Sequence, residues 1–407
     1  MKFYKLSPTE RRKVLQEKGV DLSPITSQQL KNLNNLSENV VGSISLPLGL
    51  VENLLVNGKE YMVPMATEEP SVIAAANHGS KIFARHGGVT VINRRDGIYG
   101  QIVLQVNNDF KLEDLNKKVP KLINLTNNNF ASLVHHGGGV RKITSKQENS
   151  LVYLKVLVDP AQAMGANKTN AILEFLANTL LDFTGVEEKL FAILSNYPSQ
   201  FATGKVSLPP SSVGGNEVAK KIALLSEIGM QDPYRGATNN KGIMNGVDAV
   251  LIATGNDFRA VEAATAVLAS ENGYHSLSNW KLEDNQLIGE LTLPMPIGVV
   301  GGSISVRKDV QDSYQILGKI DSEILASIII GIGLANNLAA LLAISTAGIQ
   351  AGHMSLQARN MVATLKTSDE NKEFILKQMR KYKKYTLEDA QKFLQELQEK
   401  NNASWYR

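Results

Sequence analysis

No cysteine occurs among the 407 residues of this chain. Its absence excludes disulfide bonds, thiolate metal sites and cysteine nucleophiles together. Any thioester chemistry must therefore proceed without an enzyme thiol. Net charge is also small, at +4, and Lys and Arg are spread along the chain. We therefore expect no nucleic-acid partner.

The first twenty residues, MKFYKLSPTERRKVLQEKGV, lack the apolar core of a signal peptide. We expect a cytoplasmic protein without a membrane partner. One apolar run, Ile324–Ile349, exceeds the ~20 residues that span a bilayer. Asn336 and Asn337 interrupt this run, so we predict a pair of buried helices in a large core.

The composition that remains favours a folded, multidomain protein. Hydrophobic residues make up 43% of the chain and charged residues 20%, and this length allows more than one domain. Ser7-Pro8 and Ser23-Pro24 are typical helix starts. The β-branched segments Gly97–Leu104 and Leu151–Val158 predict strands. A basic run at Arg380–Lys384 is typical of a solvated helix face, although RNA or membrane binding stays possible.

The segment Asp232–Arg259 combines polar clusters with an apolar stretch. Lys241 is surrounded by Asn and Gly, which favour turns, and Asp257 closes a Thr-Gly-Asn-Asp turn. Val247–Ala253, between the clusters, is expected to cross the core. A buried lysine beside a carboxylate can stabilise negative charge on a carbonyl oxygen. An ordinary paired or solvated loop lysine is the alternative.

A second polar cluster lies in Val63–Lys81, which reads VPMATEEPSVIAAANHGSK. Thr67 is expected to cap a helix, with Pro70 in its first turn. The two acids between them could simply favour the helix dipole. Alternatively, one of them could donate a proton to a substrate.

The stretch Asp159–Asn170, DPAQAMGANKTN, joins a predicted strand to a predicted helix at Thr169–Asp182. A small-residue turn before a helix N-terminus suits phosphate binding. It is not the GxGxxG turn of a Rossmann fold. His135 and His136 have no third ligand at a known spacing, so no metal site is predicted.

Several of these motifs together resemble the 3-hydroxy-3-methylglutaryl-CoA (HMG-CoA) reductase family. NNKGIMNGVDAV and ATGNDFRAVEA are similar to its catalytic core, and PMATEE, AMGAN and GHM are separate further matches. The resemblance extends from about Glu38 to Asn360. Without a membrane anchor, the chain resembles the bacterial, class II branch. Where the family's DAMGAN begins with Asp, this chain has Gln162.

The resemblance implies a set of site residues. The implied catalytic residues are Glu69, Lys241, Asp257 and His353. The implied substrate-binding residues are Ser71, Arg235, Asn245 and Asn336. The implied cofactor-binding residues are Arg141, Lys142, Ala163, Met164, Gly165 and Asn167. Glu69 should be buried and protonated, and Asp257 should bridge it to Lys241.

The implied fold is α+β, with a large mixed α/β substrate domain at 1–96 and 197–360. A small ferredoxin-like, non-Rossmann dinucleotide domain is inserted at 97–196, and a C-terminal helical flap covers 361–407. The implied reaction of the mevalonate pathway reduces HMG-CoA to mevalonate and CoA, through a hemithioacetal and mevaldehyde, with two hydrides from NADPH or NADH. The same site could also run this reaction in reverse. Lys142 stands where NADH-dependent members carry an acid, which favours NADPH. A homodimer or higher oligomer is implied, with the site at the subunit interface.

Two alternatives stay open. The chain could be another NAD(P)H-dependent acyl-CoA or aldehyde reductase on the same scaffold. It could also be a non-catalytic CoA-binding protein. The first differs from an HMG-CoA reductase in its acyl substrate, and the second in having no turnover at all.

Overall fold

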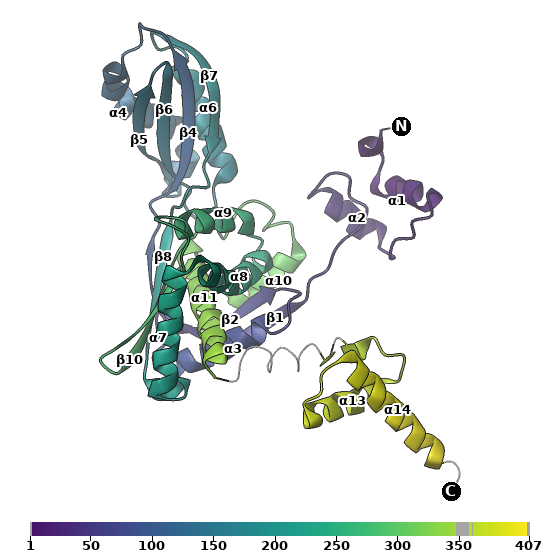
Figure 1. Cartoon of the computed structure of the whole chain (residues 1–407). Helices are drawn as coiled ribbons and strands as arrows, with labels where there is room; N and C mark the ends of the chain where they lie inside the picture. The colour runs from purple at the N-terminus through teal and green to yellow at the C-terminus, as the bar shows by residue number, and fades with distance from the viewer. Residues whose placement is uncertain (1, 347–357, 360, 405–407) are drawn as a thin grey trace. The chain divides into compact units, whose positions relative to one another are not determined.

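The computed structural model describes residues 2–346, 358–359 and 361–404 (Figure 1). The chain divides into two compact units, Met1–Leu48 and Gly49–Arg407. The first unit contains a short 3-10 helix, η1 (Phe3–Lys5), and the helices α1 (Pro8–Glu17) and α2 (Ser27–Asn34).

Both helices of the first unit begin at capping boxes. Ser7 caps α1, which confirms the predicted helix start there. The predicted start at Ser23-Pro24 is wrong, because α2 begins three residues after Pro24 and is capped by Thr26. Within this unit Arg12 donates to the carbonyl oxygens of Val41, Leu22 and Ser23. A single guanidinium thereby fixes two loops.

The second unit contains a large hydrophobic core built on helices and two sheets. A two-stranded sheet pairs β1 (Leu48–Val56) with β2 (Lys59–Ala66), and α3 (Val72–Ala84) follows it. A four-stranded antiparallel sheet has the order β3 (Thr90–Arg94), β8 (Phe201–Leu208), β10 (Gln286–Pro294), β9 (Ser278–Glu283). The remaining elements of this part are η2 (Pro210–Val213), α7 (Asn216–Gln231), α8 (Pro233–Ala253), α9 (Phe258–Ala269), α10 (Lys308–Leu317) and α11 (Ser322–Ser345).

The core is organised around α11, which packs against α3 and α8. Every residue from Leu325 to Leu338 is buried, and a helix that is apolar on all sides must be enclosed. Among the described residues α11 is one helix that is long and apolar enough to cross a membrane, yet 83% of its most apolar window is buried inside the protein. It is therefore a core helix. The predicted helix pair is wrong for the described part of the run, which is one uninterrupted helix.

A second hydrophobic cluster belongs to a separate sheet. In chain order its elements are β4 (Ile98–Val106), α4 (Leu112–Asn129), α5 (Ala131–His135), β5 (Gly139–Glu148), β6 (Leu151–Asp159), α6 (Ala166–Leu180) and β7 (Val186–Leu194). All pairs are antiparallel in the order β5-β6-β4-β7, and Figure 1 shows this sheet in blue and teal. A β-α-β-β-α-β chain with this strand order is a ferredoxin-like fold, as predicted.

The last elements are α13 (Asp369–Tyr382) and α14 (Leu387–Ser404), which share a small hydrophobic cluster of their own. Lys383, with φ at +52°, ends α13. The helical character predicted for the C-terminal segment is confirmed. With two α/β parts and these helices, the α+β fold class is confirmed as well.

Candidate functional site

Two charged side chains far apart in sequence meet at the end of β2. The ammonium Nζ of Lys241 donates to Oε2 of Glu69 at 2.7 Å, across a separation of 172 residues. Lys241 comes from α8 and Glu69 from the turn between β2 and α3. The structure thus brings together two of the four catalytic residues predicted from the sequence.

Lys241 lies in the middle of a helix, not in a loop. The turns expected around Lys241 are wrong, because Asp232 caps α8 and the chain is helical from Pro233 to Ala253. Asp232 accepts from the Tyr234 N–H, and Pro233 occupies the first turn, where its missing N–H costs nothing. Tertiary packing overrides the weak helix propensity of Gly and Asn. The stretch from Val247 onward is buried, as expected.

The helical register explains which residues accompany Lys241. Asn245 lies one turn further along α8, and residues four apart share a helix face. Arg235 lies in the first turn of the same helix. All three side chains are therefore carried by one rigid element.

The turn that carries Glu69 is shaped by its neighbours. Thr67 Oγ1 accepts from the Glu69 backbone N–H at 3.2 Å, so Thr67 organises this turn and is not the predicted cap of α3. The N-cap position of α3 is occupied by Ser71, whose φ is +80°. A non-glycine residue in this conformation is uncommon and is typical of functional turns.

The pair is more accessible than predicted. The Lys241 side chain is 62% exposed and that of Glu69 38% exposed, so the expectation that both are buried is wrong for a single chain. An ion pair this exposed contributes little to stability. Folding stability therefore does not account for this pair.

Asp257 has a different set of contacts from the one predicted. Its Oδ1 accepts from the backbone N–H groups of Arg259 and Ala260 and pairs with the Arg259 guanidinium at 3.1 Å. It caps α9 in this way. In the described residues Glu69 and Lys241 contact each other directly, and the predicted bridge through Asp257 is not formed.

Arg235 is half-buried and incompletely paired. Its Nη2 donates weakly to Asn239 Oδ1 at 3.4 Å, and its Nε has no partner among the described residues. Burial lowers the pKa of this guanidinium. A partly desolvated cation with an unused donor is suited to an anionic ligand.

Asn239, which the sequence did not single out, connects α8 to the core. Its Nδ2 donates to Ser276 Oγ at 2.6 Å and Ser278 Oγ at 3.0 Å, and its Oδ1 accepts from Asn337 at 2.9 Å. Asn337 in turn accepts from Trp280 Nε1 at 2.6 Å. Asn239 could have been recognised from the sequence as a polar residue at a helix position that faces the core, because buried polar groups are hydrogen-bonded.

Asn336 is buried between helices. It is 4% exposed, and its Oδ1 has no partner within the described part of the chain. Gly246 of α8 lies against it, since a Cβ there would overlap the Asn336 amide. His353, the fourth predicted catalytic residue, lies outside the described residues.

The turn predicted to hold a nucleotide follows β6. Ala163 and Met164 lead to Gly165, whose φ of +94° places it at the N-cap of α6, where Asn167 is in the first turn. A Cβ at Gly165 would overlap Pro160, so only glycine allows this close turn.

Two cations lie on the neighbouring strand β5. The strand bulges at Arg141, between Val140 and Lys142, and a bulge redirects a side chain. Arg141 pairs with Asp159 Oδ2 at 2.9 Å, whereas Lys142 is exposed. His135 and His136 lie before this strand, and the described residues contain no group of three metal-ligating side chains.

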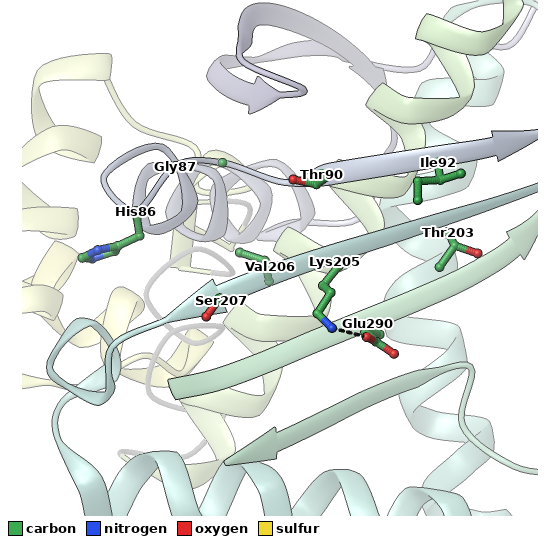
Figure 2. A pocket seen from close by; sticks show the side chains of 10 residues that line it. His86, Gly87, Thr90, Ile92, Thr203, Lys205, Val206, Ser207 and Glu290 are labelled. Carbon is green, nitrogen blue, oxygen red and sulfur yellow. Dashed lines mark ion pairs between the residues drawn. The ribbon is translucent and has the colours of Figure 1, made fainter. Parts of the chain in front are cut away.

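A surface pocket on the sheet β3-β8-β10-β9 is separate from these residues. Figure 2 shows Lys205 and Glu290, which are opposite each other in the strand register, joined at 2.9 Å on this face. His86, Thr90 and Thr203 also line the pocket. None of the predicted site residues that the structure describes lines this pocket, so we do not assign it to the site.

Comparisons with known proteins agree with the fold. Residues 7–358 match the family model described as hydroxymethylglutaryl-coenzyme A reductase. The chain is 36% identical to the 3-hydroxy-3-methylglutaryl-coenzyme A reductase of Archaeoglobus fulgidus, over 97% of this chain and 94% of that protein. It is also 36% identical to a probable enzyme of this kind from Borreliella burgdorferi, over 98% and 97%.

Solved structures are similar as well. The 3-hydroxy-3-methylglutaryl-coenzyme A reductase of Streptococcus pneumoniae gives a TM-score of 0.74 at 38% identity, covering 97% of this chain and 99% of that chain. A class II reductase structure from the same organism, bound to NADPH in open conformations, gives 0.73 at 40% identity, covering 84% and 98%. Fold and similarity together define an oxidoreductase. More specifically, the chain belongs to the hydroxymethylglutaryl-coenzyme A reductase family, in its class II branch.

Proposed function

We propose that this protein reduces HMG-CoA to mevalonate and CoA with NADPH. The observation that carries the proposal is the 2.7 Å contact between Lys241 Nζ and Glu69 Oε2. It joins a positive donor and a carboxyl group, the two groups needed to stabilise and then protonate an oxygen that gains negative charge.

The cofactor assignment is supported by the cations of β5 and by the similar class II reductase that is bound to NADPH. The dinucleotide would be held at the N-terminus of α6 by Ala163, Met164, Gly165 and Asn167. Arg141 and Lys142 lie on β5, which pairs with the strand β6 that leads to this turn. A close turn with a left-handed glycine fits a phosphate group. When bound, NADPH supplies one hydride for each of two successive reductions. We propose that residues 97–196 form its binding domain and that 1–96 with 197–360 form the substrate domain.

Lys241 would stabilise the oxyanion that develops on the thioester carbonyl and later on the aldehyde of mevaldehyde. As an exposed ammonium that is paired with a single carboxylate oxygen, it has donors left for a substrate oxygen. Asn245, one turn along α8, would add a neutral donor beside it. Glu69 would give the oxygen its proton.

Asp257, which caps α9, would be the third charged group of the site, as the family resemblance implies. The departing CoA thiolate would take a proton from His353, since an imidazole titrates near neutral pH. Arg235 would bind the free carboxylate of the acyl group with its unused Nε donor. Ser71, adjacent to the Glu69 turn, and Asn336 would complete the acyl pocket.

The exposure of the pair supports an oligomeric enzyme. A carboxyl that donates protons near neutral pH needs a desolvated environment, and Glu69 lacks it in one chain. We propose a cytoplasmic homodimer or higher oligomer in which a second subunit covers the site. The C-terminal segment 361–407 would act as a flap that excludes water.

The test is NADPH consumption, followed by absorbance, with HMG-CoA as the limiting substrate. We expect two NADPH oxidised per HMG-CoA, with mevalonate as product and free CoA thiol released. Other acyl-CoAs and simple aldehydes serve as controls. Faster turnover of another acyl-CoA would overturn the substrate assignment, and binding of CoA without turnover would overturn the enzyme assignment.

A further inference from the structure

Gln162, the first position of the QAMGAN motif, contacts the core helix α11. Its side-chain Oε1 accepts from the backbone N–H of Ser322 at 2.9 Å. Ser322 is the first residue of α11 and is 1% exposed. The first N–H groups of a helix have no acceptor within the helix. Gln162 therefore satisfies a buried donor that belongs to the other α/β part of the unit.

The same turn makes main-chain contacts with the segment Gly298–Val300. The Gln162 carbonyl oxygen accepts from the Val299 N–H at 2.9 Å, and Ala163 forms a parallel bridge with Val300. At Gly298, any Cβ would overlap the backbone of Ala163 and Met164. The approach is thus as close as two backbones allow, and the glutamine side chain adds a hydrogen bond from this turn to α11.

A second set of contacts leads from this segment to the proposed catalytic residues. The Gly298 N–H donates to Asn256 Oδ1 at 2.9 Å, and Tyr314 donates to the Gly298 carbonyl oxygen at 3.3 Å. Asn256 directly precedes Asp257 in sequence. The turn that begins the nucleotide motif is therefore linked through Gly298 to the start of α9.

The charges near the hydrogen bond between Gln162 and Ser322 explain why a neutral acceptor suits position 162. Asp321 already caps α11 by accepting from the Ile324 N–H at 2.8 Å. The guanidinium of Arg95, which donates to the Met295 and Ile297 carbonyl oxygens, lies in the field of Glu323, Asp159 and Asp321. An amide oxygen satisfies Ser322 without adding a further negative charge.

From this geometry we infer that Gln162 is a positioning residue for dinucleotide binding. Its carboxamide fastens the turn Ala163–Asn167 to the first turn of α11, and so fixes where the cofactor meets the substrate domain. The inference rests on the proposed function of that turn. Gln162 itself need not contact the cofactor.

The test compares Gln162→Met, which removes the acceptor at similar size, with Gln162→Glu, which retains it. Gln231→Met is the matched control, because this exposed glutamine at the end of α7 bonds only to Glu227 of its own helix among the described residues. The full chain is used throughout. Hydrogen exchange at the Ser322 amide shows whether its hydrogen bond to Gln162 is intact, and this measurement needs no cofactor. Fluorescence titration with NADPH measures cofactor affinity.

We expect Gln162→Met to speed Ser322 exchange and to weaken NADPH binding, each by about fivefold to tenfold, as for loss of one hydrogen bond. The KM for HMG-CoA should stay within about twofold. Gln162→Glu should keep Ser322 exchange within about threefold of the parent, because the acceptor is present. It should weaken NADPH binding less than Gln162→Met does, since only its added negative charge is unfavourable. Gln231→Met should change neither.

An unchanged rate of Ser322 exchange in Gln162→Met would overturn the claim that Gln162 holds the turn Ala163–Asn167 to α11. Faster exchange with unchanged NADPH affinity would overturn the positioning role, and equal losses for NADPH and HMG-CoA would show general loosening instead. If the parent chain failed to turn over HMG-CoA, the proposed function would fail while the exchange result at Ser322 still stood.

Discussion

Individual side chains along α8 differ in their surroundings, and so in what they can do. Lys241 is exposed and paired with a carboxylate from another element. Seven residues further on, Asp248 is half-buried on the side towards Glu262 of α9, and its Oδ1 has no partner in the described residues. Burial, together with the hydrogen bond to Glu262 and its charge, raises the Asp248 pKa to about 8. One helix therefore carries a group that we propose to serve chemistry and another that costs stability.

We predict that Asp248→Asn stabilises the protein, increasingly so as pH rises. The folded protein retains a proton on Asp248 that the unfolded chain releases above its ordinary pKa of 3.8. Folding therefore loses stability between about pH 4 and pH 8. Asn keeps a hydrogen-bond donor for Glu262 and has no proton to retain. The free energy of unfolding should therefore rise by about 1–2 kcal/mol at pH 8, after allowance for partial exposure. Thermal unfolding at pH 5 and pH 8 measures it, and a gain at pH 5 as large as at pH 8 would contradict the argument.

The cofactor preference is also a single-residue property. Lys142 is an exposed cation on β5, beside the bulge at Arg141. A cation favours the 2′-phosphate of NADPH, and an acid favours the free ribose hydroxyl of NADH. We predict that Lys142→Asp shifts the ratio of kcat/KM values from NADPH towards NADH by about tenfold or more. The control is Lys146→Asp, further along the same strand and paired with Glu148. An unchanged ratio in Lys142→Asp would remove Lys142 from the site.

Among the elements, α11 sets the arrangement of the others. Small residues allow α3 and α8 to approach it closely. At Gly79 of α3 an added Cβ would lie 2.6 Å from the Ala335 Cα, within the α11 backbone. A backbone cannot move aside as a side chain can, so this contact fixes the spacing of α3 and α11.

We predict that Gly79→Ala lowers the free energy of unfolding by about 1–3 kcal/mol, since it forces two helices apart. Gly242→Ala in α8 is the matched control, because nothing lies within 4 Å of its added Cβ. That control should be neutral or should gain about 0.5–1 kcal/mol from helix propensity. Denaturant unfolding compares the two, and equal effects would show that close packing at Gly79 is unimportant.

Local pattern predicted some of these elements well and others poorly. β4, β6 and the start of α1 follow from β-branched runs and a capping box, both of which are local signals. The helical state of α8 could not be predicted, because its Gly and Asn residues favour turns and only burial against α11 makes it a helix.

The same division holds for the site. Glu69 and Lys241 were found through motif resemblance, and their contact depends on tertiary structure that no local pattern encodes. Exposure was predicted wrongly, since it depends on what covers the site. The link from Gln162 to Ser322 spans 160 residues, and no sequence period signals such a pair.

On the scale of the whole molecule, the exposed Lys241–Glu69 pair must be shielded from water during the reaction. A second subunit would supply the cover, and a symmetric dimer would then contain two equivalent sites. If Lys241 and His353 of one site come from different subunits, each inactive variant can restore the other.

We predict that a mixture of Lys241→Ala and His353→Gln, refolded or co-expressed, recovers about a quarter of the parent activity. Half of the dimers are mixed, and each has one site with both residues intact. Sedimentation of each variant alone is the control for dimer formation. Activity that stayed at the level of the separate variants would indicate that both residues belong to the same subunit.

The most direct test of the account is Lys241→Ala, assayed with HMG-CoA and with mevaldehyde, alongside its thermal unfolding. We predict that kcat falls by about 10²–10³-fold on both substrates, because both reductions need the same oxyanion donor. The melting temperature should hardly change, since the ion pair with Glu69 is exposed. Activity within about tenfold of the parent, from a variant that is folded, would contradict the central claim that the Lys241–Glu69 pair is the centre of the reaction.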